Sequence, residues 1–107
     1  MPQINLEFDD SKVSTQEAEA LSRAVQKIVV DVTGIKDVFV YGNSAQIKIQ
    51  IAPIEIFVKI SASKVTDLDQ LFEQIKQSLV DWKTESKFEH PINLTVIPMN
   101  WKFGVGI

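Results

Sequence analysis

The pattern of apolar and polar residues in the first third of the chain predicts a strand followed by a helix. Residues 4–8 alternate between the two kinds, which is typical of a strand with one apolar face. Apolar side chains then recur at steps of three and four over residues 18–32, so an amphipathic helix is expected. Ser14 and Glu17 form a capping-box sequence before this helix, and Gly34 supplies a left-handed stop after it.

The middle of the chain reads as strands. Residues 38–41 are β-branched and aromatic, and Gly42-Asn43 is expected to break this strand. Isoleucines alternate with polar residues over 47–51, and again over 54–60 in the opposite phase. One extra residue at Ala52-Pro53 would cause that shift, which predicts a bulge or bend and a hairpin in the middle of the chain.

The last third repeats the order of the first. Helix-start signals at residues 66–70 precede apolar residues at helical spacing over 68–82, and residues 92–96 alternate as a last strand. We therefore predict an α+β fold, in which two β-α-β units form one mixed sheet with both helices on one face. We expect one domain over residues 1–107, with pseudo-repeats at about 1–52 and 53–107.

Aromatic side chains are expected on the sheet face that the helices leave open. The residues concerned are Phe39, Tyr41, Phe57 and Trp101. An apolar face of this kind indicates that an oligomer buries it.

Composition narrows the classes of function. The chain has 107 residues, 11 Lys plus Arg against 14 Asp plus Glu, one His and no Cys, so its formal charge is 11 − 14 = −3. We therefore expect no metal centre, no cofactor and no nucleic-acid partner, because these call for ligand clusters or basic patches. With no signal-like start and no apolar run near the ~20 residues that cross a bilayer, we expect a cytoplasmic protein without a membrane partner.

A general base is therefore hard to find in this composition. His90 lies next to Pro91 in a polar connection, where most histidines are solvated, and several carboxylates stand at helix starts, where caps are usual. The remaining source is the chain terminus, because an initiator Met is removed readily when a small residue such as Pro2 follows. The freed amine has an ordinary pKa of roughly 8, and an apolar pocket would lower it. Proline at position 2 also occurs in proteins without such chemistry.

Several local patterns resemble the tautomerase superfamily, which includes 4-oxalocrotonate tautomerase and macrophage migration inhibitory factor. Pro2 opens the first strand, and Thr33-Gly34-Ile35-Lys36 is similar to the end of the first helix in the inhibitory-factor branch. The segment at residues 52–58 resembles the proline-led central strand of that branch, and residues 92–100 resemble its last long strand. Phe103-Gly104-Val105-Gly106 is similar to a segment of the shorter oxalocrotonate branch.

The resemblance implies a homotrimer that acts on a small-molecule substrate. It implies that Pro2 is the catalytic acid and base for keto–enol tautomerisation, that Lys12 and Lys36 bind substrate, and that Phe103 is the apolar wall. Further pocket or interface candidates are Tyr41, Asn93 and Trp101. The expected function is a tautomerase-like isomerase acting on a small enolisable carbonyl compound.

Differences from the family pattern leave alternative functions open. The last strand has Asn93 and Thr95 where the inhibitory-factor branch has a Tyr and an Asn, and the single Arg of the chain, Arg23, lies within the first helix. Lysine does not replace the two-pronged grip of arginine on a carboxylate, which counts against a dicarboxylate substrate. With Met1 attached, the Pro2 nitrogen is an amide and is no base. The alternatives are a non-catalytic trimer of the same fold with a different binding role, and a ferredoxin-like small-molecule-binding domain.

Overall fold

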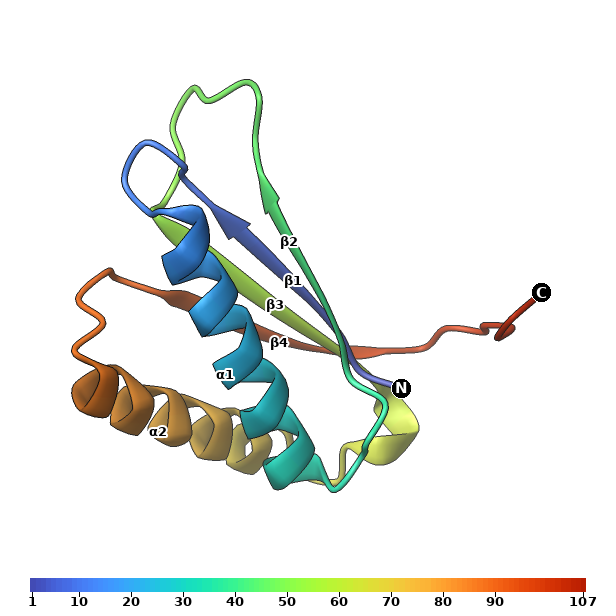
Figure 1. The fold of residues 1–107 in the computed structure, drawn as a ribbon. Helices are drawn as coiled ribbons and strands as arrows, with labels where there is room; N and C mark the ends of the chain where they lie inside the picture. The colour runs from blue at the N-terminus through green and yellow to red at the C-terminus, as the bar shows by residue number, and fades with distance from the viewer.

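The computed structural model describes all 107 residues as two β-α-β units (Figure 1). In chain order the elements are β1 (Gln3–Phe8), α1 (Thr15–Thr33), β2 (Phe39–Ser44), β3 (Ile54–Ser61), a short 3-10 helix (Ala62–Lys64), α2 (Leu68–Ser86) and β4 (Asn93–Met99). The first unit is β1-α1-β2 and the second is β3-α2-β4. Neither helix is long and apolar enough to cross a membrane.

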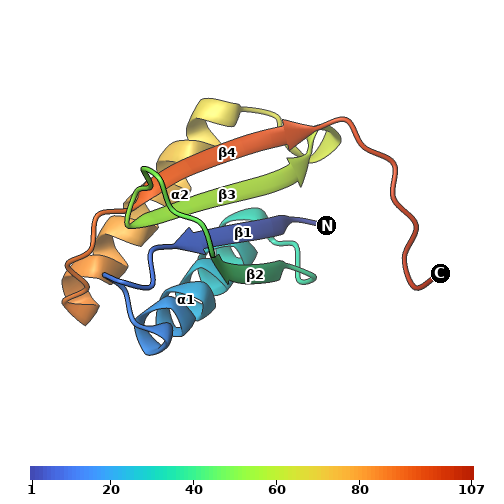
Figure 2. The same ribbon diagram turned by 90° about the horizontal axis from the view of Figure 1, so that it is seen from above.

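The four strands form one mixed sheet in the order β2-β1-β3-β4. Within each unit the two strands are parallel, and the units join where β1 and β3 pair antiparallel. Both helices cover the same face of the sheet (Figure 2). The predicted α+β fold class is thereby confirmed. The hairpin of the ferredoxin-like alternative is absent, because β1 separates β2 from β3.

Local sequence signals set the helix ends as predicted. The Ser14 side chain accepts a hydrogen bond from the Glu17 backbone, and Glu17 in return accepts one from the Ser14 backbone, which completes the capping box. Gly34 ends α1 with a φ of 73°, a left-handed value that glycine adopts without strain. Asp67 caps α2 by accepting a hydrogen bond from the Gln70 backbone.

The core lies between the sheet and the two helices. Alternate residues of the two central strands are fully buried, as the period-2 pattern predicts. From β1 and β3 these residues are Ile4, Leu6, Ile54, Ile56, Val58 and Ile60, and from the helices they are Ala18, Leu21, Val25, Val29, Ile75 and Leu79. The strands that begin the two units are therefore the best-buried part of the molecule.

The other face of the sheet, which we call the open face, has no covering layer in the single chain. Strand register arranges its side chains in three cross-strand rows. From the N-terminal end of β1, the rows are Phe39-Gln3-Lys59-Ile97, then Tyr41-Asn5-Phe57-Thr95, then Asn43-Glu7-Glu55-Asn93. The predicted aromatic side chains of β2 and β3 lie on this face, with Phe39 and Tyr41 about half exposed.

Two predictions for the middle of the chain are wrong. Strand β2 does not break at Gly42-Asn43, because both residues pair with β1. Residues 47–51 are not a strand, and no hairpin forms there. They lie in the connection of residues 45–53, which we call the 45–53 loop, and β3 begins only at Ile54. An alternating pattern makes a strand only where another strand pairs with it, and β1 already occupies the place beside β3.

One contact between the units predicts a pH dependence of stability. Glu17 lies 2.8 Å from the His90 ring through Oε2 and accepts the Ser14 backbone N–H through Oε1. The Ser14 hydrogen bond, with His90 second, lowers the pKa of Glu17 below its usual value of 4.5. Its stabilisation is therefore complete above that value and is lost as the pH falls through the lower, folded-state pKa.

We accordingly expect Glu17→Gln to flatten the dependence of the unfolding free energy on pH below about 5. Urea unfolding at a series of pH values between 3 and 7 measures this. The matched control is Glu85→Gln on the exposed side of α2, which should keep the wild-type pH dependence. An unchanged profile for Glu17→Gln would show that the contact does not contribute.

Candidate functional site

Pro2 is held rigidly where β1 and β2 begin. Its side chain is among the fully buried ones, although it stands one residue from the chain end. Its carbonyl accepts a hydrogen bond of 3.2 Å from the Phe39 backbone N–H, which ties Pro2 to the first residue of β2. The position of the Pro2 nitrogen is therefore fixed by the sheet, as a catalytic group requires.

A small cavity of about 110 Å³ is lined by Met1 and Gln3, the two chain neighbours of Pro2, whereas the buried Pro2 side chain does not line it. Its walls come from the chain start, from β2 and from the C-terminal tail, and they consist of Met1, Gln3, Phe39, Tyr41, Trp101 and Phe103. Five of the six are apolar or aromatic, and the amide of Gln3 is the one fully polar side chain. The structure thus brings together three residues singled out in the sequence, Tyr41, Trp101 and Phe103, in a cavity that the two neighbours of Pro2 also line.

The tail is positioned by specific contacts. After β4 the chain runs past the end of the sheet at which β1 begins (Figures 1 and 2). The Trp101 indole donates a hydrogen bond of 2.8 Å to the Ser61 hydroxyl at the end of β3. Phe103 packs edge-on against Trp101, with 5.9 Å between ring centroids. These two aromatic rings therefore form one wall of the cavity.

Met1 connects the Pro2 nitrogen with the cavity, because it is bonded to that nitrogen and also lines the cavity. Removal of Met1 would leave a secondary amine one residue away from the apolar walls. Burial among such walls penalises the charged form of an amine and lowers its pKa, which raises the fraction of neutral amine near pH 7.

The other predicted site residues lie elsewhere in the single chain. Lys12 stands in the turn after β1, roughly 20 Å along the strand from Pro2 at 3.3 Å per residue. Asn93 is in the row farthest from Pro2 and donates to Glu55 over 3.0 Å. Lys36 lies at the same end as Pro2, between α1 and β2, but its exposed side chain does not line the cavity.

Sequence reasoning missed three residues at this site. Gln3 and Phe39 line the cavity, and Lys59 stands directly across from Gln3 on the open face. Only the pairing of the strands could have predicted them, since Gln3 on β1 pairs with Phe39 on one side and with Lys59 on the other. Lys59 is therefore the cation that register places beside the cavity, and it is partly buried.

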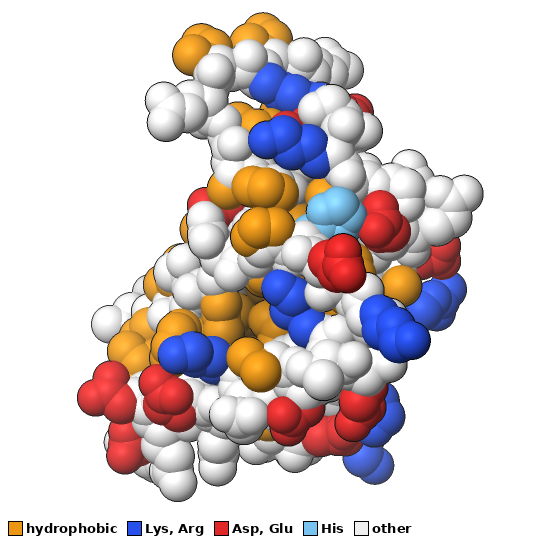
Figure 3. All heavy atoms as spheres, turned by 90° about the vertical axis from the view of Figure 1, so that its left-hand side faces the viewer, with side chains coloured by type: hydrophobic (Ala, Val, Ile, Leu, Met, Phe, Trp, Pro, Cys, Tyr) orange, Lys and Arg blue, Asp and Glu red, His pale blue; other side chains and the backbone are white.

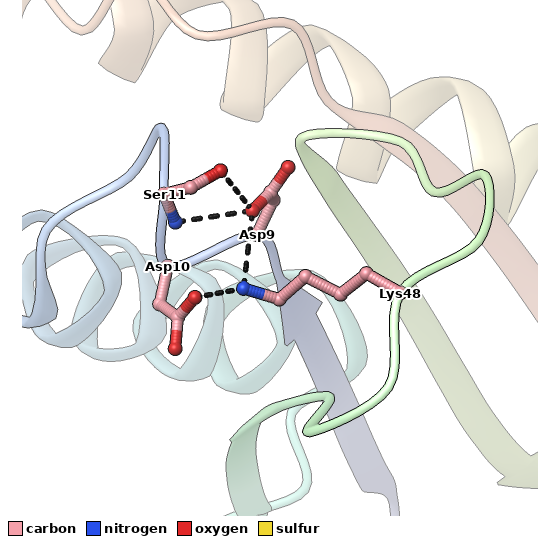
Figure 4. A network of polar contacts seen from close by, with 4 residues as sticks. All are labelled: Asp9, Asp10, Ser11 and Lys48. Carbon is pink, nitrogen blue, oxygen red and sulfur yellow. Dashed lines mark hydrogen bonds and ion pairs between the residues drawn. The ribbon is translucent and has the colours of Figure 1, made fainter.

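A second polar cluster lies at the opposite end of β1 (Figure 4). Asp9 accepts hydrogen bonds from the Ser11 backbone (3.0 Å) and hydroxyl (2.6 Å), and these lower the pKa of Asp9. Lys48 reaches from the 45–53 loop to donate to Asp10 and lies 3.4 Å from Asp9. The contact lowers the pKa of Asp10 and raises that of Lys48, so the pair stays charged throughout the neutral range.

The cluster has no metal-site character. No three histidine or acidic side chains of the chain lie close enough together to hold a metal ion. Asp9, Asp10 and Lys48 instead satisfy one another and fasten the 45–53 loop to the turn after β1.

Structures of the same architecture are known. No protein-family model matches the sequence, and neither does any curated protein. A macrophage migration inhibitory factor-like protein from Entamoeba histolytica is 18% identical, with a TM-score of 0.64 over 96% of this chain and 95% of that chain. A wild-type fused 4-OT, described as an asymmetric trimer, is 13% identical, with a TM-score of 0.68 over 97% and 92%.

A third similar structure, 5-carboxymethyl-2-hydroxymuconate delta-isomerase, is 13% identical, with a TM-score of 0.65 over 97% of this chain and 89% of that chain. Identities this low establish the fold and leave the chemistry open. The chain therefore has the fold of the tautomerase superfamily, as its sequence predicts.

Proposed function

We propose that the chain, once Met1 is removed, is a tautomerase-like isomerase in which the amine of Pro2 is the acid and base. The observation that carries the proposal is the placement of Pro2. Its ring is buried, its nitrogen is bonded to Met1, which lines an aromatic cavity, and none of the side chains that line this cavity is itself a candidate base. The fold it shares with isomerases and inhibitory factors supports the same chemistry.

The reaction would be a proton transfer within one substrate. The neutral Pro2 amine takes a proton from the carbon next to a carbonyl, and the resulting ammonium returns a proton to the oxygen, which gives the enol. The reverse direction uses the same groups, so the amine ends each turnover as it began. The Gln3 amide and the Tyr41 hydroxyl both line the cavity and can donate a hydrogen bond to the carbonyl oxygen.

The walls of the cavity indicate the substrate class. Trp101, Phe103 and Tyr41 fit an apolar or aromatic body beside an enolisable carbonyl, and no cation lines the cavity itself. We propose that Lys59, one strand away from Gln3, attracts a single carboxylate, and that Lys36 approaches from the same end of the sheet. Lys12 would contribute only from a second copy of the chain, because it lies at the far end of β1.

Assembly as a homotrimer is part of the proposal. The open face exposes aromatic rings that a neighbouring copy would cover, and the fused 4-OT structure is described as a trimer. Light scattering should therefore give about three times the chain mass. A monomer at micromolar concentration would contradict this part of the proposal while leaving the Pro2 chemistry to be tested separately.

The second candidate function is a non-catalytic one with the same fold. Its support is Met1, which in the intact chain blocks the Pro2 nitrogen and occupies one wall of the cavity. A chain that keeps Met1 in the cell would have a cavity for an apolar ligand and no base beside it.

Removal of Met1 distinguishes the two functions. We expect the enol form of phenylpyruvate to be converted by protein treated with an aminopeptidase until mass spectrometry shows a Pro2 terminus. The same preparation before treatment should be about 10²–10⁴-fold less active, which is the usual contribution of a positioned acid–base group. Equal rates for the two forms would contradict the proposal. Mass spectrometry of the protein from its natural source then shows which form exists in the cell.

A further inference from the structure

Helix α2 carries more apolar surface than the sheet covers. It has 19 residues, as α1 has, yet only Ile75 and Leu79 of α2 are buried, whereas α1 buries four residues. The difference follows from sheet order, because α2 packs against β4 and no strand continues the sheet beyond β4. Val80 is consequently 47% exposed. Apolar surface that the fold leaves uncovered is a candidate binding surface.

A groove of about 230 Å³ runs between α2 and β4 over this surface. Its apolar walls are Phe72, Leu79 and Val80 of α2, Leu94 of β4, and Ile92 just before β4. The two remaining side chains of the groove are Lys76 and Lys83, and no acidic side chain lines it. Figure 3 faces this side of the molecule and shows hydrophobic side chains with Lys or Arg side chains next to them, below the histidine. The groove therefore combines apolar walls with positive charge alone.

The two lysines of the groove differ in how they are held. The Lys83 ammonium donates a hydrogen bond of 2.7 Å to the His90 carbonyl, which fixes its direction and leaves two of its three donors free. Lys76 is exposed and forms no ion pair within the chain. The chain as a whole has a net charge of −3, so a groove with two cations and no carboxylate is a local exception. Its charge is complementary to that of an anion.

The dimensions of the groove favour a slender ligand. From Phe72 to Lys83 the groove follows roughly 16 Å of the α2 axis, at 1.5 Å per residue. Its volume lies below the roughly 300–1,000 Å³ of pockets that hold compact drug-sized molecules. A protein partner is too large for it, because a protein interface uses roughly 20–30 residues on each side, and seven line this groove. An unbranched alkyl chain with one anionic end matches both the shape and the charge.

We infer that this groove is a binding site for a fatty carboxylate, whose alkyl chain lies along the apolar walls and whose carboxylate binds Lys76. The site is separate from the cavity near Pro2, since the two share no residue. They also lie on opposite faces of the sheet, because Leu94 pairs with the buried Ile56, whereas Gln3 and its row belong to the open face. Binding in the groove therefore does not depend on removal of Met1.

Equilibrium dialysis of the full chain against decanoate tests the inference. Decanoate should bind, and decylammonium, which has the same chain length and the opposite charge, should bind at least about tenfold more weakly. Acetate supplies the carboxylate without the alkyl chain and should not bind. Absence of decanoate binding up to about 1 mM, or equal affinities for decanoate and decylammonium, would overturn the inference.

Charge substitution tests the place of the carboxylate. Lys76→Glu should raise the decanoate dissociation constant by at least about tenfold, because the groove then presents a carboxylate to a carboxylate, and Lys76→Arg should keep it within about twofold. The matched control is Lys64→Glu, which makes the same change in net charge at an exposed position outside the groove. An equal loss of affinity in Lys64→Glu would show that only the net charge matters and would overturn the inference.

Nuclear magnetic resonance distinguishes the groove from the cavity near Pro2, whose walls are also apolar. Decanoate should shift the amide signals of Val80, Ile92 and Leu94 and leave those of Gln3 and Tyr41 in place. The reverse pattern would place the ligand in the other cavity and overturn the inference. Lys76→Glu should leave the tautomerase rate of the Met1-free protein unchanged, so the groove and the proposed Pro2 chemistry are tested independently.

Discussion

Replacing Pro2 with alanine in the Met1-free protein is expected to lower kcat for phenylpyruvate tautomerisation by about 10²–10⁴-fold. Alanine keeps an amine at the terminus but removes the buried ring of Pro2. The nitrogen then loses the ring that fixes its direction. This loss reduces the rate of proton transfer, while the apolar walls of the cavity remain.

The pH profile separates this effect from a structural one. In the wild type the base must be neutral, so kcat should rise with pH through the pKa of the Pro2 amine, and the Pro2→Ala protein should keep a low kcat across that range. Pro91→Ala, in the exposed connection before β4, is the matched control and should keep both the rate and the profile. A Pro2→Ala protein with wild-type kcat would exclude Pro2 as the base.

Replacing Ile56 with alanine is expected to destabilise the chain by about 2–5 kcal/mol. Ile56 is fully buried at the middle of β3, where it pairs with Leu6 on one side and with Leu94 on the other. Truncation leaves a cavity beneath both helices that the surrounding strands cannot close. For a chain of about 100 residues this is a large share of the total stability.

Phe57 is the natural comparison because it is the next residue of β3 and lies on the open face. Phe57→Ala should cost less in the stability of each chain and more in assembly, since the proposed interface covers that face. Urea unfolding at several protein concentrations separates the two effects, because the stability of an assembly depends on concentration. Equal stability losses for the two variants at all concentrations would contradict the assignment of the two faces.

The two β-α-β units could be predicted because their signals are local. The capping box at Ser14, the glycine at position 34 and the burial period of α1 all act within a few residues. Gly42 misled the prediction for a physical reason. It lies in an edge strand paired with Leu6, and a Cβ there would meet only the Ser22 hydroxyl at 3.7 Å, so the sheet places no special demand on this position.

The 45–53 loop shows the limit of a periodic pattern. Alternation specifies which side chains would share a face, but it does not specify what pairs with the backbone. The isoleucines of the loop alternate as regularly as those of β3, yet β3 lies between two strands and the loop lies beside none. The difference is set by sheet order, which depends on contacts between residues far apart in sequence.

The candidate site likewise contains some residues that the sequence indicates and others that only the strand pairing reveals. The chain start and short motifs indicate Pro2, Trp101 and Phe103, and the structure places Trp101 and Phe103 around one cavity together with Met1 and Gln3, the neighbours of Pro2. Gln3 and Lys59 have no sequence signal of their own, because their proximity to the cavity follows from the antiparallel pairing of β1 with β3. The expectation for Lys12 comes from a resemblance in chain order, which carries no information about distance within the folded chain.

Each β-α-β unit has a proline directly before its first strand, Pro2 before β1 and Pro53 before β3. The carbonyl of each accepts a backbone hydrogen bond, from Phe39 and from Asp9 respectively, so the two prolines are anchored alike. Only Pro2 can ever carry a free amine, because Ala52 is bonded to the nitrogen of Pro53. The internal repetition of the fold therefore does not double the chemistry, and a ligand of the Pro2 amine would saturate at one molecule per chain however many chains assemble.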